Sequence, residues 1–558
     1  MWTHSRRTGA VVASILLVLA VALAGCGGAS TSSTSGQPKT GGTLTVVPSP
    51  YGSFTRNFNP YSSSVNSGTQ GMIYETLLYF NREKAGSVQP WLASAYNWSS
   101  DGKTLTFTLR NGVKWSDGKP FTSADVVFTL NYLHQNPGID TYSLWSVISS
   151  VSAPDPQTVT VNFSTTSFTY LWYLAGQTYI LPQHLWSSVT DPVTYTDPNP
   201  VGTGPFTLKS FDPQLYVFAK NPNYWQPGKP YIDAVRYPAY TSNTSADLLL
   251  SQASVDWTGV FSPNLEKTFV QRDPTHDKYW FPPSNDVMLY TNDAKAPFNN
   301  VAVRQAISDA IDRTQLSKVG EDGYEQVASP TALILPNEQS FLAPQYASTK
   351  FTVDTAKAEQ LLQSAGYTKG SDGIYQDSSG HKLSFNLNVV TGWTDWVTDC
   401  QIMADELKKI GIQVTVNAVS YGAYIAALNN GQFDMAISWT SPGPTPFYLL
   451  YNMLDSKLSA PIGQKAISNW ERWMDPTTDS LLQQYANTND KATQEQAIYG
   501  LQKIMVEQLP AIPLVYGATW YEYNTSQFTG FPDANNPYAG PAPWQYPDVE
   551  VVAMNIHR

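Results

Sequence analysis

The chain has 558 residues, which is enough for several domains with large cores. Its formal net charge is −11, and this acidic balance excludes a nucleic-acid partner, because phosphate binding needs clustered lysine and arginine. The chain has 17 Trp, 33 Tyr and 22 Phe. The number of tryptophans is unusual, because it exceeds what the packing of hydrophobic cores usually requires.

Residues 1–26 have the pattern of a targeting segment. A basic start precedes an apolar run that is too short for a comfortable membrane span. The run ends in Leu-Ala-Gly-Cys, which resembles a bacterial lipobox and predicts a lipid anchor on Cys26; the alternative is an ordinary signal peptide with a chance cysteine. Residues 27–42 are rich in Gly, Ser and Thr and predict a flexible tether. With Cys26 lipidated, Cys400 has no partner for a disulfide or a cysteine metal cluster.

The first folded segments are predicted from turns and alternation. A strand is expected over residues 42–48, and an amphipathic helix that passes into a strand over residues 71–80. A hairpin turn at Asp101-Gly102 precedes a strand in which apolar residues alternate with threonines. Ser123 is expected to cap the next helix, and alternation predicts another strand over residues 159–163.

Strands and helices then alternate through the rest of the chain. The glycines of residues 201–211 are expected to need backbone angles that only glycine adopts freely. Periodicity and caps predict helices over residues 246–253, 300–316, 355–365 and 421–428, a helix ended by Gly411, and strands over residues 412–416 and 433–439. This alternation is typical of a mixed α/β domain.

Signals for catalysis are mostly absent. The six histidines are scattered, without the close pairing that holds zinc, and there is no Gly-x-Ser-x-Gly motif. A pair of carboxylates that acts as in a glycosidase is not ruled out by the sequence, because the two members of such a pair come together only in the fold. No catalytic residue, metal or cofactor is therefore predicted.

Residues 92–128 (L-A-S-A-Y-N-W-S-S-D-G-K-T-L-T-F-T-L-R-N-G-V-K-W-S-D-G-K-P-F-T-S-A-D-V-V-F) resemble the signature of the bacterial extracellular solute-binding proteins of family 5. These are receptors that feed ABC importers. The resemblance implies an α/β fold of the periplasmic-binding-protein type II-like kind, in which two mixed α/β lobes joined by a hinge close around a ligand, with an additional third domain. The expected division is lobe I in residues 43–80, 200–291 and 515–558, extra domain II in residues 81–199, and lobe II in residues 292–514.

The class of ligand is predicted from the stretch around Trp439. Peptide receptors of this family commonly carry an acid shortly after the matching tryptophan, and that acid neutralises the peptide ammonium. In this chain Trp439 is followed by residues 440–446 (T-S-P-G-P-T-P), which include no acid. A neutral ligand therefore fits this environment better than a peptide with a charged ammonium group. Residues 528–552 also resemble the ending of the oligosaccharide-binding branch, although Phe531 stands where tryptophan is frequent.

Tryptophan faces can cover the apolar faces of sugars while neutral polar groups satisfy the hydroxyls. Each ring could equally fill the core, and Asp395 and Asp399 could bind hydroxyls or be solvated acids at a helix start. The predicted ligand-binding residues are Asn59, Tyr61, Trp257, Asn292, Trp393, Trp396, Tyr424 and Trp439.

The expected protein is a monomeric receptor outside the cytoplasm, held at the membrane by its lipid anchor. Its expected partners are a neutral, β-linked oligosaccharide and the permease subunits of an ABC importer. The alternatives are an oligopeptide receptor of the same family and a secreted glycoside hydrolase.

Overall fold

The computed structural model describes residues 38–48, 52–84, 87–335, 337–466 and 468–558. The predicted signal peptide, Cys26 and most of the predicted tether lie outside the described residues. Residues 39–558 form one compact unit. Among the helices that the structure describes, none combines the length and the apolar character needed to cross a membrane.

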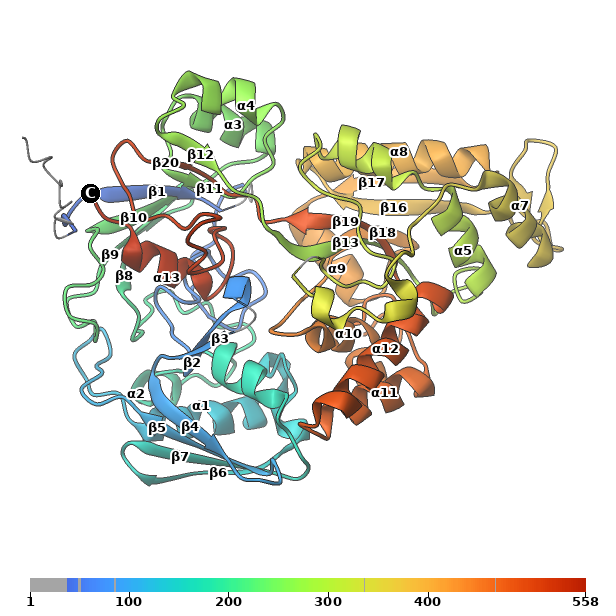
Figure 1. Cartoon of the computed structure of the whole chain (residues 1–558). Coiled ribbons are helices and arrows are strands. Elements are labelled where there is room, and N and C mark those ends of the chain that lie inside the picture. The colour runs from blue at the N-terminus through green and yellow to red at the C-terminus, as the bar shows by residue number, and fades with distance from the viewer. Residues whose placement is uncertain (1–37, 49–51, 85–86, 336, 467) are drawn as a thin grey trace, which may run out of the picture. The chain divides into compact units, whose positions relative to one another are not determined.

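A seven-stranded sheet is assembled from distant parts of the chain, in the order β12-β20-β11-β1-β10-β9-β8 (Figure 1). Strand β1 lies in the middle, parallel to both of its neighbours, and every residue after its first is buried. Buried residues of the helices α3 (Asn243–Ser251) and α4 (Leu265–Thr268) share a small core with Val47 at the end of β1. The strands are β1 (Thr43–Val47), β8 (Phe206–Asp212), β9 (Leu215–Lys220), β10 (Ala234–Pro238), β11 (Trp257–Thr258), β12 (Asp277–Tyr279) and β20 (Glu522–Asn524).

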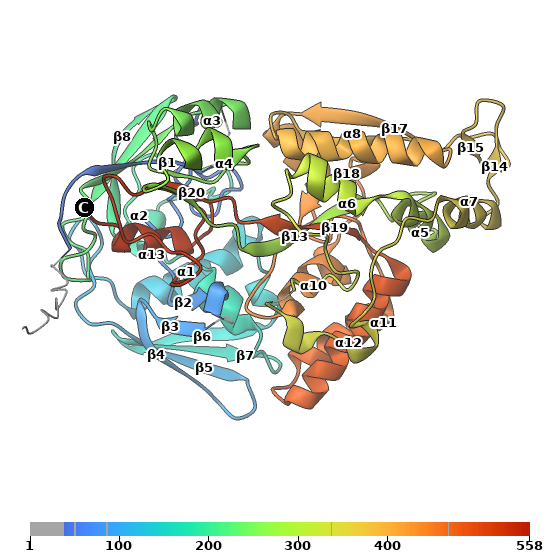
Figure 2. The ribbon, with the colours of Figure 1, turned by 45° about the horizontal axis from the view of Figure 1, so that its top comes forward.

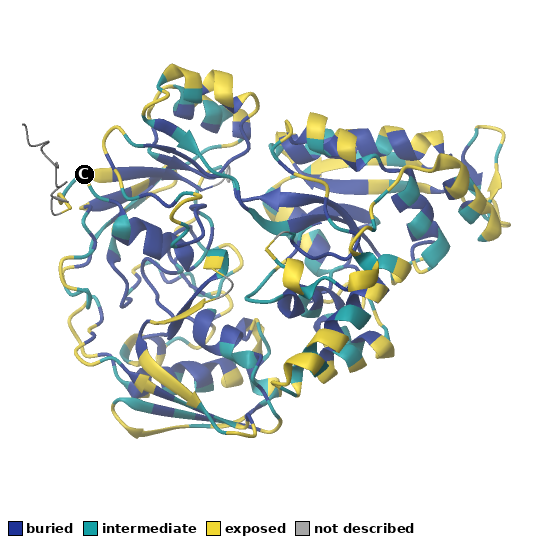
Figure 3. Cartoon of the chain, viewed as in Figure 1, coloured by how far each residue is buried: buried dark blue, intermediate teal, exposed yellow. Residues whose placement is uncertain are grey.

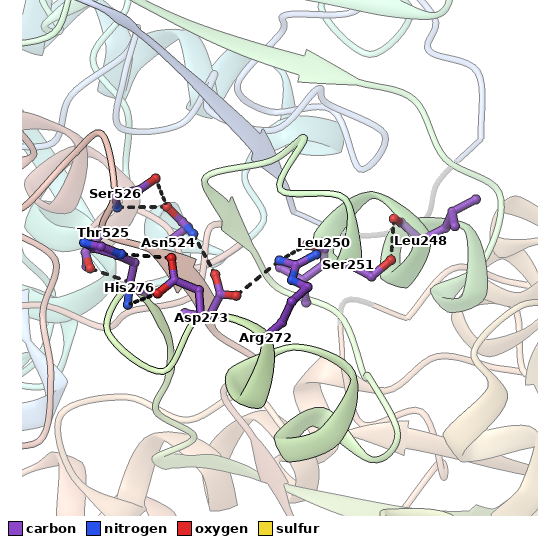
Figure 4. A network of polar contacts seen from close by, with 10 residues as sticks. Leu248, Leu250, Ser251, Arg272, Asp273, His276, Asn524, Thr525 and Ser526 are labelled. Carbon is purple, nitrogen blue, oxygen red and sulfur yellow. Dashed lines mark hydrogen bonds and ion pairs between the residues drawn. The ribbon is translucent and has the colours of Figure 1, made fainter.

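A polar network fixes the edge of this sheet (Figure 4). Arg272 donates to the Leu250 carbonyl at 3.2 Å and to Asp277 Oδ2 at 3.1 Å. The other oxygen of Asp277 accepts from Asn524 Nδ2 at 2.6 Å. Because Asp277 is completely buried, these bonds and the guanidinium charge compensate its carboxylate, and they tie β12 and β20 to α3.

The second sheet has five strands in the order β17-β16-β18-β13-β19. Along β18 the side chains of Met435 and Ile437 belong to the core beneath α8, whereas Ala436 faces the core that contains Tyr424 of α9. The two helices therefore cover opposite faces of the sheet (Figure 1), and a second view shows α8 beside β17 (Figure 2). These elements are β13 (Pro283–Thr291), β16 (Ser384–Val390), β17 (Gln413–Val419), β18 (Met435–Trp439), β19 (Ile512–Ala518), α8 (Thr394–Lys409) and α9 (Tyr421–Asn429).

The predicted alternation of helices and strands in this region is confirmed, with one interruption. The helix expected over residues 300–316 ends early, at Ala310, because Asp312 caps a new short helix by accepting from two backbone N–H groups. The remaining elements of this half are α5 (Val301–Ala310), α6 (Arg313–Gln315), α7 (Thr355–Ser364), β14 (Thr368–Lys369), β15 (Tyr375–Gln376), α10 (Pro446–Leu454), α11 (Pro476–Ala486) and α12 (Lys491–Gln508). The last helix, α13 (Asp548–Asn555), lies in the half with the seven-stranded sheet (Figure 1).

A four-stranded sheet, in the order β4-β5-β7-β6, contains the segment with the family signature. The predicted hairpin is confirmed, since Trp98 of β4 pairs with Leu105 of β5. The helix cap is one residue earlier than predicted: Thr122 caps α1 and forms a capping box with Asp125. The elements here are β2 (Leu78–Asn81), β3 (Ser87–Pro90), β4 (Ala93–Trp98), β5 (Thr104–Leu109), α1 (Ser123–Gln135), β6 (Ile148–Asp155), β7 (Thr158–Phe163) and α2 (Gln183–Trp186).

The helix predicted for the first part of residues 71–80 is wrong, whereas the strand into which it was predicted to pass is confirmed as β2. This segment consists of turns followed by β2, and all ten residues are buried (Figure 3). An amphipathic helix needs a solvent face, which this segment lacks. Its carbonyl groups instead accept hydrogen bonds from Gly204 and Phe206, which hold it against the glycine-rich segment.

Gly202 and Gly204 are required for close approach and not, as predicted, for special backbone angles. Neither has a positive φ. A Cβ on Gly202 would lie 1.8 Å from the Ile73 carbonyl oxygen, and one on Gly204 would lie 2.5 Å from the Met72 oxygen. The backbone of residues 72–73 therefore occupies the space that any side chain would need. The domain boundaries expected from the sequence stay a prediction.

Candidate ligand-binding site

A cavity of about 570 Å³ is lined by residues of the seven-stranded and the five-stranded sheet regions and of the segment around Trp172. This volume is in the ordinary range for small-molecule sites. Its wall is rich in rings and in neutral amides; the amides are those of Gln177, Asn243, Asn285, Asn452 and Gln545.

Three predicted residues, Trp393, Trp396 and Trp439, meet in this wall. Trp393 and Trp396 flank the first turn of α8, and Trp439 ends β18. The ring centroids of Trp393 and Trp396 are 5.1 Å apart at 87°, and those of Trp439 lie 6.0 and 6.2 Å from the other two. The start of α8 thus places two indoles, and the end of β18 places one, in a common aromatic cluster.

Rings that the sequence did not single out complete the wall. Phe261 and Trp520 pack edge to face at 5.3 Å, and Trp544 also lines the cavity. Tyr142 stacks on Tyr173 at 4.8 Å on another part of the lining. Only Trp544 lay in a segment that the sequence had flagged, the ending that resembles the oligosaccharide-binding branch.

Trp257 and Tyr424 do not line the cavity. Both are completely buried. The Trp257 indole N–H donates to the Pro541 carbonyl at 2.9 Å, and the Tyr424 hydroxyl donates to the Ile437 carbonyl. Tyr424 nevertheless lies 6.3 Å from Trp393 between ring centroids, so it packs behind the aromatic cluster.

Asn59 and Asn292 are also completely buried and away from the cavity. The side-chain amide of Asn59 donates to the backbone carbonyls of Pro192 and Tyr195, both at 2.8 Å. Asn292 uses its amide in the same way on the Gly431 carbonyl at 2.8 Å. Both side chains therefore join loops to neighbouring segments.

Tyr61 lines a second cavity, of about 820 Å³. Its hydroxyl donates to the Tyr179 carbonyl at 2.6 Å. The two cavities share lining residues, including Tyr142 and Gln177. Tyr61 is therefore next to the aromatic cavity and not in it.

Two nearly buried polar groups of the lining keep atoms free of protein partners. Gln545, with 3% of its surface exposed, accepts from the Ala542 backbone N–H at 3.1 Å, whereas its Nε2 has no hydrogen-bond partner among the described residues. Glu325, also 3% exposed, accepts from the Ala518 N–H with Oε1, and its Oε2 has no partner among those residues either. Buried polar atoms of this kind are normally satisfied, so both suit hydrogen bonds to a ligand.

The charged groups of the lining are few. Arg82 is the one cation among the described lining residues, and its guanidinium lies 4.0 Å from the buried Asp548 carboxylate. Asp395 accepts from Asn243 Nδ2 at 3.3 Å, and burial raises the pKa of Asp395 to about 6. No group of three or more His, Cys, Asp or Glu suited to a metal ion occurs within the described part of the chain.

Comparison with known proteins gives consistent matches. The family model for bacterial extracellular solute-binding proteins, family 5 (middle region), matches residues 87–460. The glutathione-binding protein GsiB of Escherichia coli (strain K12) is 25% identical over 476 residues, which cover 83% of this chain and 87% of that protein. The oligopeptide-binding protein AppA of Bacillus subtilis (strain 168) is 27% identical over 472 residues, covering 78% and 81%.

One solved structure is a periplasmic oligopeptide-binding protein of an oligopeptide ABC transporter from Thermotoga maritima, with mannohexaose bound. Its TM-score with this chain is 0.86 at 26% identity, and the match covers 92% of this chain and 98% of the other. The predicted fold class, a mixed α/β fold of the periplasmic-binding-protein type II-like kind, is thereby confirmed.

Proposed function

Since the chain belongs to the bacterial extracellular solute-binding proteins of family 5, we propose that its aromatic cavity captures a neutral, β-linked oligosaccharide. Proteins of this family are binding receptors outside the cytoplasm. The receptor then presents the ligand to the permease subunits of an ABC importer, and a lipid on Cys26 keeps it at the membrane.

The observation that carries this proposal is the aromatic cluster of Trp393, Trp396 and Trp439 in a wall that also holds neutral amides. A sugar ring has an apolar C–H face, which an indole covers, and a rim of hydroxyl groups, which amides satisfy in both directions. The residues that follow Trp439 and line the cavity are Thr440, Ser441 and Pro442, none of them acidic. The mannohexaose ligand of the Thermotoga maritima protein supports the same ligand class.

An oligopeptide is the second candidate, because the lining contains charges of both signs. Arg82 could meet a peptide carboxylate, and Asp395 or Glu325 an ammonium group. Two features weigh against this alternative. The Arg82 guanidinium already lies beside Asp548, and both lining acids are nearly buried, where burial raises their pKa values and favours the uncharged form.

Titration of intrinsic tryptophan fluorescence tests the proposal. We expect saturable changes with cello- or manno-oligosaccharides at micromolar concentrations, corresponding to about −8 kcal/mol, and no change with a mixed peptide pool. The oligosaccharide recovered from the complex should be intact. If only peptides gave saturable binding, the ligand would be a peptide and not an oligosaccharide. Recovery of shortened oligosaccharides would indicate a hydrolase.

A further inference from the structure

One part of the cavity wall is built from carboxyl groups. Glu325 and Asp395 line the cavity, with 3% and 5% of their surfaces exposed. Glu325 Oε1 is held by the Ala518 backbone N–H at 2.5 Å, so the side chain is fixed in place. Its Oε2, which has no partner among the described residues, is the atom left for a ligand.

Further carboxyl groups lie behind these two. Glu321 interacts electrostatically with Glu325, Asp395 and Asp399, and the carboxyls of Glu321 and Asp399 are close enough to share a proton. Asp247 on α3 interacts electrostatically with Asp395, and Glu522 on β20 interacts in the same way with Asp247. We call these six residues the acidic wall: Asp247, Glu321, Glu325, Asp395, Asp399 and Glu522.

Among the residues that the structure describes, no cation compensates the acidic wall. Across the described residues, none of the six carboxyls forms an ion pair with lysine, arginine or histidine. The groups that act on Glu325 are the Ala518 N–H, which lowers its pKa, and Asp395 and Asp399, which raise it. Ionising several neighbouring buried carboxyls together is costly, because each loses hydration and repels the others.

Burial first, and then the neighbouring carboxyls, raise the pKa of Glu325 well above its ordinary value. Burial and the neighbouring carboxyls therefore favour the protonated form of Glu325. A carboxylic acid donates a hydrogen bond, whereas a carboxylate only accepts, so protonation decides which ligand atoms Glu325 can contact.

We propose that this receptor binds its ligand in a proton-linked manner, with the protonated Glu325 carboxyl donating through Oε2 to a hydroxyl or ether oxygen of an uncharged ligand. This inference rests on the proposed function, because it takes an uncharged, oxygen-rich ligand as its premise. Loss of the proton removes the donor and places a negative charge against the ligand oxygen and Asp395. An ammonium ligand would show the opposite dependence, since it binds the ionised acidic wall more tightly.

The test uses the folded receptor with cellotetraose and mannotetraose as probes, titrated from about pH 5 to about pH 9. For a bound state that requires one proton, the affinity falls up to tenfold per pH unit above the pKa of the free site. We expect wild-type affinity to fall at least tenfold over this range. Calorimetry in buffers of different ionisation enthalpy should show proton uptake on binding at the alkaline end.

Glu325→Gln provides the matched variant, because glutamine keeps a donor and an acceptor but cannot ionise. It should bind at pH 5 and change its affinity less than about twofold up to pH 9. Glu338→Gln, which removes a partly buried acid that does not line the cavity, should keep the wild-type pH dependence.

A flat wild-type profile without proton uptake would overturn the inference while leaving oligosaccharide binding intact, and so would equal slopes for wild type and Glu325→Gln. Absence of oligosaccharide binding at every pH would instead refute the proposed function. Peptide affinity that rises with pH would assign the acidic wall to ammonium recognition. If Glu325→Gln does not fold, the pH dependence of wild-type affinity and the proton uptake on binding still test the inference.

Discussion

Replacing Glu522 with glutamine tests whether a buried carboxyl group makes the protein less stable as the pH rises. Glu522 lies on β20 with none of its surface exposed, and its Oε2 accepts from the Thr258 hydroxyl at 2.5 Å. Its Oε1 has no hydrogen-bond partner among the residues that the structure describes. Burial, reinforced by the Asp247 carboxyl and opposed by the Thr258 hydrogen bond, raises the pKa of Glu522 to about 8.

The direction of the effect follows from proton binding. The unfolded chain releases this proton near the ordinary pKa of 4.5, whereas the folded protein holds it until the pH approaches 8. Below the unfolded-state pKa, Glu522 is protonated in both states and has no effect on the pH dependence of stability. Above it, the free energy of unfolding falls by about 1.4 kcal/mol per pH unit, which amounts to about 3 kcal/mol between about pH 5 and about pH 7.5.

Urea unfolding followed by tryptophan fluorescence measures this quantity at both pH values. We expect Glu522→Gln to gain about 3 kcal/mol over the wild type between the two conditions, because glutamine has no proton to lose. Glu495→Gln, on the exposed surface of α12, is the control and should show no such gain. If the difference between Glu522→Gln and the wild type is the same at both pH values, the buried carboxyl is not the source of the pH dependence.

Three further substitutions test the site and the fold. Trp439→Ala removes one indole of the aromatic cluster and should lower oligosaccharide affinity at least tenfold in fluorescence titration, whereas Trp98→Ala, away from the cavity, should leave it unchanged. Gly202→Ala places a methyl group against the Ile73 carbonyl and should cost about 3 kcal/mol or more in thermal unfolding; a stable variant would disprove the close approach. Thr122→Ala removes the cap of α1 and should cost about 1 kcal/mol, while Thr122→Ser should restore it.

Much of the local structure was predictable because its causes are local. The hairpin at Asp101-Gly102 and the alternation through β5 and β7 depend on turn chemistry and on one buried sheet face. The turns of residues 71–77 were mispredicted as a helix, because apolar periodicity does not reveal that the segment is buried on every side. The role of Gly202 was missed for a related reason, since the group it must avoid belongs to Ile73.

The sequence by itself indicated the family, the class of fold and three indoles that line the cavity, because the signature in residues 92–128 and the ends of regular elements are visible in the order of residues. Only the tertiary structure decided that Trp520 and Glu325 share a wall with Trp393, and that Trp257 does not. It also decided that acids far apart in the chain meet where the described residues supply no ion-pairing lysine, arginine or histidine. Burial and proximity of this kind arise when distant segments pack, and they set the charge state of a carboxyl group that no local pattern records.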